Sequence, residues 1–449
     1  MTPTSQARSA PALDPEVVIP QVELNRAKWA GCVGTLLENF DISIYSTATA
    51  LVFNSVFFPN VSPSVGYIIS FGAFGAGFAA RPLGGLFFSL YGDKLGRKFV
   101  LVATLYLMGT ATVLIGLLPT YAQIGVMAPL LLTICRILQG FGAGAEMGSS
   151  NVLLAEFAPY GKRGATTSLM WVGASIGFVL GAIVFIGLQQ LPHAAFMAYG
   201  WRLAFLSSIV MTLAAWIIRR KMQESPVFAS VRQRRLLEAR STLQEVFTSG
   251  RRPLLRVFLI NVGNHAHSYF YSAFVGAYLV GTVKIAPTVI PQMVLLGGIS
   301  AIGGALMGGR AVDKWGRKPV SIVLATALIV FTPVAFLLMR TGNLWLIAIV
   351  YLFGFAAAVE GGSAAHAPWF AELVGSRYRL AAVTIGREVS AIFGGGIAPS
   401  ICSALLSWYA GNFWPVAIYM MLMSGVTLVQ SCTAPETRDR NLVDERDPP

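Results

Sequence analysis

The sequence of 449 residues is short of charged side chains. Only 12% of its residues are Asp, Glu, Lys or Arg, whereas a soluble globular chain carries about 25%. Apolar residues make up 55% of the chain, which is more than a soluble fold could cover with so little polar surface. This balance excludes an ordinary soluble enzyme and a disordered protein, and it favours a chain that lies in a lipid bilayer.

Cysteine clusters and nucleotide-binding motifs are also missing. The four cysteines, Cys32, Cys135, Cys402 and Cys432, form no CxxC pair, which argues against a disulfide framework and a zinc site. No GxxxxGK[ST] loop and no HExxH motif appear, so neither ATP hydrolysis nor zinc-peptidase chemistry is indicated. We therefore expect no enzymatic activity and no cofactor or metal.

The net charge of +13 lies in short clusters between long apolar runs. A nucleic-acid-binding protein would gather such charge on one soluble face, so no nucleic-acid partner is expected. A membrane-spanning helix needs about 20 mostly apolar residues. Twelve runs meet this requirement: 29–58, 65–91, 98–118, 126–157, 165–190, 201–218, 254–281, 290–312, 318–339, 344–374, 380–408 and 413–432.

Basic residues are concentrated after every second run. Twenty lysines or arginines lie in these connections, nine of them in 219–253, against three on the other side: Arg202, Lys284 and Arg340. Positive charge stays on the cytoplasmic side of a membrane, so both termini are predicted to be cytoplasmic. Residues 1–28 are polar and lack the apolar core of a signal peptide.

The two halves of the chain repeat one another. The segment 92–100 (GDKLGRKFV) resembles 312–320 (VDKWGRKPV) at an offset of 220 residues. A weaker echo at an offset of 216 aligns Glu156 and Arg163 with Glu372 and Arg379. Duplicated halves are how many transporters build alternating access. The predicted organisation is an N-terminal tail (1–28), a six-helix bundle (29–218), a basic cytoplasmic linker (219–253), a second six-helix bundle (254–432) and a C-terminal tail (433–449).

These motifs resemble the major facilitator superfamily, whose signature loop is similar to both copies of the repeat. More narrowly, the chain resembles the metabolite:H⁺ symporter family from about residue 29 to 440. The matching segments are 37–41 (LENFD) with Tyr45, 136–140 (RILQG), 200–205 (GWRLAF), 224–228 (ESPVF) and 435–437 (PET). Asn39, Ala145 and Ala204 depart from the family's Trp, Gly and Pro, so the resemblance does not carry a substrate identity.

Intramembrane polar residues are the candidates for proton coupling. Glu38 and Asp41 lie one turn apart in the first span, where paired carboxyl groups can bind and release a proton. Arg136 and Glu146 lie in the fourth span, about 15 Å apart along a helix, which is too far for a direct pair. The resemblance places Arg136 in the coupling machinery, whereas a structural ion pair remains the alternative.

Substrate contacts are expected from both halves. Arg387 is the candidate for a substrate carboxylate because an arginine fork stays charged and binds carboxylates bidentately. Pairing with Glu388 or Glu360 is its structural alternative. Histidine in the seventh span could relay a proton or serve only in packing. The predicted substrate-binding set is Arg387, Arg136, Tyr45, Gln139, His267, Tyr271 and Glu360.

The repeated loops have a different expected role. By resemblance, Asp93 and Arg97 in one loop and Asp313 and Arg317 in its copy hold the halves together during conformational gating, supported by Arg81. The alternative is that these charges only orient the chain in the membrane.

The sequence thus predicts an all-α membrane protein of the major facilitator fold, in a bacterial inner membrane and as a monomer. Its expected partners are protons, membrane lipids and a small-molecule substrate. The expected function is proton-coupled import of a small organic acid or zwitterion by alternating access. Two alternatives stay open at this point: a proton-coupled exporter, and a membrane sensor that binds solute without moving it.

Overall fold

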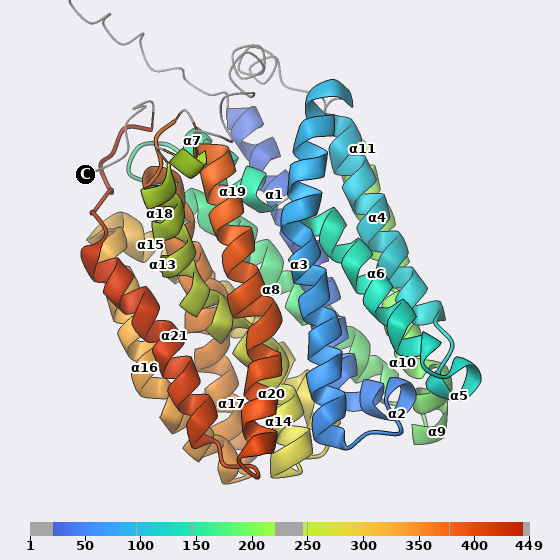
Figure 1. Cartoon of the computed structure of the whole chain (residues 1–449). Helices are drawn as coiled ribbons and strands as arrows, with labels where there is room; N and C mark the ends of the chain where they lie inside the picture. Colours follow the sequence, from blue (N-terminus) through green and yellow to red (C-terminus); the bar gives the residue numbers. More distant parts are fainter. Residues whose placement is uncertain are drawn as a thin grey trace, which may run out of the picture.

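The computed structural model describes residues 21–95, 97–144, 147–220, 246–248, 250–376 and 378–442 (Figure 1). The side chains of 89–101 lie outside this description, although the backbone there is helical apart from residue 96. Most of the predicted linker 219–253 also lies outside it. The first helix begins at Gln21, inside the segment predicted as a tail.

Twelve helical rods make up the described part of the chain, in agreement with the twelve predicted spans. The first six consist of α1 (Gln21–Ala48) with α2 (Asn54–Phe57), α3 (Pro63–Leu95), α4 (Arg97–Leu117), α6 (Met127–Ala143) with α7 (Met147–Phe157), α8 (Arg163–Leu188), and α9 (His193–Ala195) with α10 (Trp201–Leu206) and α11 (Ser208–Arg220). The short helix α5 (Tyr121–Ile124) lies between the third and fourth rods.

The second six rods repeat this arrangement. They consist of α13 (Arg251–Tyr269) with α14 (Val275–Tyr278), α15 (Val289–Trp315), α16 (Arg317–Arg340), α17 (Leu344–Gly354) with α18 (Gly362–Glu372), α19 (Arg379–Ser390) with α20 (Ala398–Trp408), and α21 (Trp414–Thr433). The predicted all-α class, with twelve helical rods in two six-helix bundles, is confirmed for the described residues.

Eight of the rods contain a helix long and apolar enough to cross a bilayer by length and composition. The other four begin with α1, α4, α6 and α13. Two of them, α1 and α13, carry polar stripes that lower their mean hydropathy, including Glu38 and Asp41 on α1. A polar stripe is tolerated in a membrane when it faces the protein interior, so these rods are expected to line the functional site.

Several rods contain a π-helical turn, a feature frequently found at functional sites. Four of these turns lie within the rods that begin with α1, α13, α17 and α19: Thr49–Phe53, Phe270–Phe274, Phe355–Gly361 and Ala391–Ile397. One of them contains the buried carboxyl group of Glu360.

The two bundles meet along α8 and α15 and along α3 and α20 (Figure 1). Glycine permits the closest approach: a Cβ added to Gly309 of α15 would lie 2.5 Å from the carbonyl oxygen of Gly164 on α8. Small residues let helix backbones come together in the same way in other membrane proteins. The bundles are therefore in direct backbone contact at the end where α8 begins.

Candidate functional site

Two polar regions join the bundles. One is a buried group of side chains inside the membrane-spanning part, here called the central cluster: Glu38, Asp41, Arg81, Arg136, Gln139 and Glu388. The other is an ion-pair network at the end where α8 and α16 begin, here called the face network: Glu156, Arg163, Asp313, Arg317, Glu372 and Arg379.

Asp41 of α1 is held by neutral hydrogen-bond donors. Its Oδ2 accepts a hydrogen bond from Thr112 Oγ1 at 2.7 Å and one from Gln139 Nε2 at 3.4 Å. The carboxyl group is partly exposed, because it lines a cavity of about 40 Å³ that Glu38, Arg81 and Arg136 also line. A cavity of this size has room for a few water molecules. Asp41 is thus placed where water can reach it without a direct ion pair among the described residues.

Arg136 of α6 lies next to this carboxyl group through Gln139. Its Nη1 donates to Gln139 Oε1 at 2.5 Å, and Gln139 reaches Asp41 in turn. The guanidinium group also lies over the ring of Tyr45, 3.6 Å from its centroid, and over Phe74 at 4.6 Å. The structure therefore brings together Asp41, Gln139, Arg136 and Tyr45, which the sequence assigned to coupling and substrate binding.

Arg81 of α3 lies in the central cluster, away from the loops that it was predicted to support. Its Nε donates to Glu388 Oε2 at 2.5 Å, and its Nη1 donates to Glu38. Glu38 comes from the first bundle and Glu388 from α19 of the second, so one buried guanidinium joins the two bundles. The sequence indicated Glu388 only as a partner of Arg387, and the structure pairs it with Arg81 instead.

Arg387 is buried without a carboxylate within ion-pair distance among the described residues. Its guanidinium group lies over the Trp171 ring at 5.3 Å, and its Nη2 lies 3.6 Å from Met147 Sδ. The predicted alternative of an ion pair with Glu388 or Glu360 is not found. Glu360 is itself buried, and its Oε2 has no hydrogen-bond donor among the described residues.

His267 and Tyr271 lie in the packed interior of the second bundle. His267 Nε2 contacts Thr332 Oγ1 at 3.1 Å, and its Nδ1 contacts Ser424 Oγ at 3.2 Å. Tyr271 packs against Phe270 and Gly354, and its hydroxyl has no hydrogen-bond partner among the described residues. These contacts favour the packing alternative for His267 over a role in a proton path.

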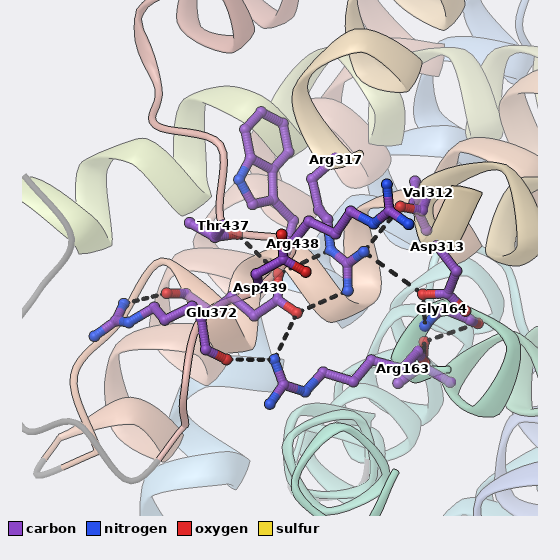
Figure 2. Close-up of polar contacts among 12 residues, drawn as sticks. Arg163, Gly164, Val312, Asp313, Arg317, Glu372, Thr437, Arg438 and Asp439 are labelled. Carbon is purple, nitrogen blue, oxygen red and sulfur yellow. Dashed lines mark hydrogen bonds and ion pairs between the residues drawn. The ribbon is translucent and has the colours of Figure 1, made fainter. Parts of the chain in front are cut away.

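The face network is built on Glu372 at the end of α18 (Figure 2). Arg317 donates to both of its carboxylate oxygens, at 2.9 and 2.8 Å, and Arg163 of the other bundle donates to Oε1 at 3.1 Å. Thr437 adds a hydrogen bond of 2.8 Å from the C-terminal segment. A single buried carboxyl group thus binds two arginines from different bundles.

The repeat places its charges crosswise between the bundles. Arg163 pairs with Glu372, and Arg379 pairs with Glu156 at 3.1 Å. Asp313 accepts hydrogen bonds at 2.8 Å from the backbone N–H groups of Gly164 and Ala165, at the N-terminus of α8. Helix N-termini favour such anions. Arg163, Glu156, Glu372 and Arg379 were absent from the predicted gating set, although the weak echo at an offset of 216 residues pointed to them.

The side chains of three predicted site residues lie outside the part of the chain that the structure describes. Glu146 lies outside the described residues, and so do the side chains of Asp93 and Arg97. Of the gating prediction, Asp313 and Arg317 are found in the face network, 3.5 Å apart.

Known proteins resemble the chain along most of its length. Residues 29–252 match the family described as "Sugar (and other) transporter". The shikimate transporter of Escherichia coli (strain K12) is 33% identical over 90% of this chain and 93% of its own. The proline/betaine transporter of the same strain is 29% identical over 95% and 86%.

A solved structure of a D-xylose-proton symporter superposes on the chain with a TM-score of 0.71. The superposition covers 93% of this chain and 99% of the other, at 17% sequence identity. At that identity the likeness establishes the common fold, and it says nothing of the solute.

Proposed function

Because the chain belongs to the sugar (and other) transporter family of the major facilitator superfamily, we propose that it imports a small organic acid or zwitterion together with a proton. It is a multi-pass membrane transporter, and its relatives are named as transporters. The proposal concerns the driving ion, the direction and the class of solute. Relatives whose names specify shikimate or proline and betaine support a carboxylate-bearing solute.

The observation that carries the proposal is the position of Asp41. Its carboxyl group lines a cavity, accepts hydrogen bonds from neutral groups, and is linked to Arg136 only through Gln139. A carboxylate held by a direct arginine pair would keep its charge, whereas this one can gain or lose a proton without breaking an ion pair. Asp41 is therefore the proton-binding group in this mechanism, and Arg136 responds to its charge.

Alternating access follows from the two inter-bundle regions. The face network holds the bundles together at the end predicted to be cytoplasmic, so this conformation is closed on that side. Proton and substrate enter from the other side, the bundles rock, and the face network breaks to release both inward. Asp93 and Arg97 would add to this network from the first copy of the repeated loop.

The proposed topology follows the charge distribution. Both termini and the linker 219–253 lie in the cytoplasm, the bundles span 29–218 and 254–432, and the monomer resides in the inner membrane of a bacterium. The described residues of both inter-bundle regions come from one copy of the chain, which supports a monomer.

The test is uptake into proteoliposomes with an imposed inward proton gradient, using labelled shikimate, proline, betaine and a panel of other organic acids. A gradient of one pH unit supplies about 1.4 kcal/mol per proton, enough for an accumulation of about tenfold when one proton moves with each solute molecule. We expect Asp41→Asn to abolish accumulation while exchange of labelled for unlabelled solute continues, since exchange needs no net proton movement.

The matched control makes the same chemical change at an exposed position, Asp439→Asn, and should accumulate solute like the wild type. Accumulation that persists in Asp41→Asn would contradict the assigned proton site. Gradient-driven extrusion from vesicles of known orientation would establish the exporter instead.

A further inference from the structure

Arg387 differs from the other buried arginines in its hydrogen bonds. Arg81, Arg163, Arg317 and Arg379 each donate to at least one carboxylate, and Arg136 donates to the side-chain oxygen of Gln139. Arg387 donates to no oxygen atom among the described residues. Its one hydrogen-bonding contact is the sulfur of Met147, and its Nε has no acceptor.

A second hydrogen-bond donor without an acceptor lies next to this guanidinium group. Trp171 of α8 lies under Arg387 of α19, and its indole Nε1–H also has no acceptor among the described residues. Trp171 is 6% exposed and Arg387 is 3% exposed, so water does not satisfy them from the surface. The two residues belong to different bundles, and the pair therefore spans the boundary that opens in alternating access.

Leaving these donors unpaired is costly inside a membrane protein. A buried N–H group without an acceptor costs about 1–3 kcal/mol, and a buried charge without a partner costs several kcal/mol. A thioether sulfur is a weak acceptor that leaves most of this cost uncompensated. The carboxylate next in the sequence, Glu388, is already bound by Arg81. The residues that the structure describes thus supply no oxygen acceptor for either donor.

We infer that Arg387 and Trp171 form a carboxylate clamp between the bundles, in which the substrate's carboxylate accepts hydrogen bonds from the guanidinium group and the indole N–H. The inference rests on the proposed function and narrows its solute to a carboxylate, including the carboxylate end of a zwitterion. An amide of the same shape has only one acceptor oxygen, and it would leave the guanidinium charge uncompensated. The clamp therefore selects acids over their neutral analogues.

Because one donor comes from each bundle, the substrate's carboxylate is bound by both only when the bundles are close together. Opening of the side where the face network breaks separates the starts of α8 and α19 and removes one of the two donors. Binding is thus tightest in the closed conformation, and release follows from the motion that opens it. A purely structural role for the pair, in which the indole ring supports the guanidinium group, would not involve the N–H.

The discriminating variant is Trp171→Phe, which keeps an aromatic ring for the guanidinium group and removes the N–H. We expect the KM for the best acid of the uptake panel to rise about tenfold, the loss typical of one hydrogen bond to a charged acceptor, with maximal rate little changed. The matched control is Trp201→Phe: Trp201 is also buried, also lacks an acceptor for its Nε1 and also lies beside an arginine, Arg202. Its KM should stay at the wild-type value.

Binding without transport supplies a second measurement. The unfolding temperature of the purified protein should rise with each carboxylate that it binds and not with the corresponding amide, for which benzoate and benzamide serve as one pair of the panel. Arg387→Lys should lower the affinity for the carboxylate while the protein stays folded, since it keeps the charge and loses the fork.

The outcomes separate this inference from the proposed function. Equal KM values for Trp171→Phe and Trp201→Phe, with proton-driven uptake intact, would overturn the clamp and leave the function standing. Stabilisation by carboxylates that is lost in Trp171→Phe, without any proton-driven uptake, would support the clamp and overturn the function. Stabilisation by no carboxylate of the panel, or equally by acids and amides, would overturn the clamp.

Discussion

The face network and the membrane-spanning part of the protein, where Arg136 and Arg387 lie, use arginine in opposite ways. In the face network, Glu372 binds two arginines, and Arg317 also reaches the carbonyl oxygen of Val312. In the membrane-spanning part, Arg387 has no oxygen acceptor and the Nε of Arg136 has none, among the described residues. Each arginine of the first region donates to a carboxylate, although the Nε of Arg163 has no acceptor among the described residues. Arg387 in the second region donates to no carboxylate among these residues, which leaves hydrogen-bonding capacity for a ligand.

The two kinds of arginine therefore have different roles: one kind holds the bundles together, and the other is available to bind a ligand. An ion-pair network in which every arginine has a carboxylate partner stabilises one arrangement of the bundles, and it must be broken for the other to form. A guanidinium group that the protein leaves without an oxygen acceptor contributes little to that arrangement and is available to an anion. Arg81 belongs to the first kind although it lies within the central cluster, because Glu38 and Glu388 occupy it from both bundles.

The largest expected effect contrasts these two kinds of arginine within the membrane. Arg81→Gln leaves two buried carboxyl groups without their cation, and we expect unfolding in detergent to become easier by about 3–5 kcal/mol. Arg387→Gln removes a buried charge that has no carboxylate partner within ion-pair distance among the described residues, so this variant should be at least as stable as the wild type. Thermal unfolding of the two purified variants measures the difference. A similar loss of stability in both would show that Arg387 has a structural partner.

The next effect concerns Glu372, the carboxyl group that binds two arginines of the face network. Glu372→Gln keeps the shape of the side chain and removes the charge that binds Arg163 and Arg317, so the closed conformation should lose about 2–3 kcal/mol. A cysteine introduced at Asn151, which is buried and bonds to Ala367 of the other bundle, should then react faster with a maleimide.

The control for that experiment is Glu156→Gln in the same reporter background, with the native cysteines replaced. Glu156 is partly exposed and binds Arg379, so its loss should accelerate labelling less than the loss of Glu372. If Glu372→Gln and Glu156→Gln accelerated labelling equally, Glu372 would have no special role in the network, and both ion pairs would contribute equally to the closed conformation.

Much of the central cluster could be predicted from the sequence, because it depends on spacing within single helices. Asp41 and Tyr45 share a face of the first helix, and Arg136 and Gln139 lie one turn apart in the fourth. Their association needs only that two helices of one bundle face each other. Family resemblance and helical periodicity together were sufficient for this part.

The contacts between the bundles could not be predicted in the same way. Arg81 and Glu388 lie 307 positions apart, and their pairing depends on how α3 docks against α19, which no local pattern records. Trp171 carries no sequence signal at all, since a tryptophan in an apolar helix ordinarily serves in packing. Glu372 and Arg163 did carry a signal, the repeat itself, but a repeat does not say that its charges pair crosswise.

The smallest expected effect tests whether close backbone contact, rather than charge, holds the two bundles together at the end where the face network lies. Gly309→Ala on α15 places a methyl group 2.5 Å from the carbonyl oxygen of Gly164, so α8 and α15 must separate slightly, at a cost of about 1 kcal/mol to the closed conformation. Labelling of the cysteine at Asn151 should rise about fivefold, as that energy implies. Gly303→Ala on the same helix has no atom within 4 Å of the added methyl group and should leave labelling unchanged. If Gly309→Ala also left it unchanged while Glu372→Gln accelerated it, charge alone would hold the face closed, and the glycines would serve only to let the two helices pack.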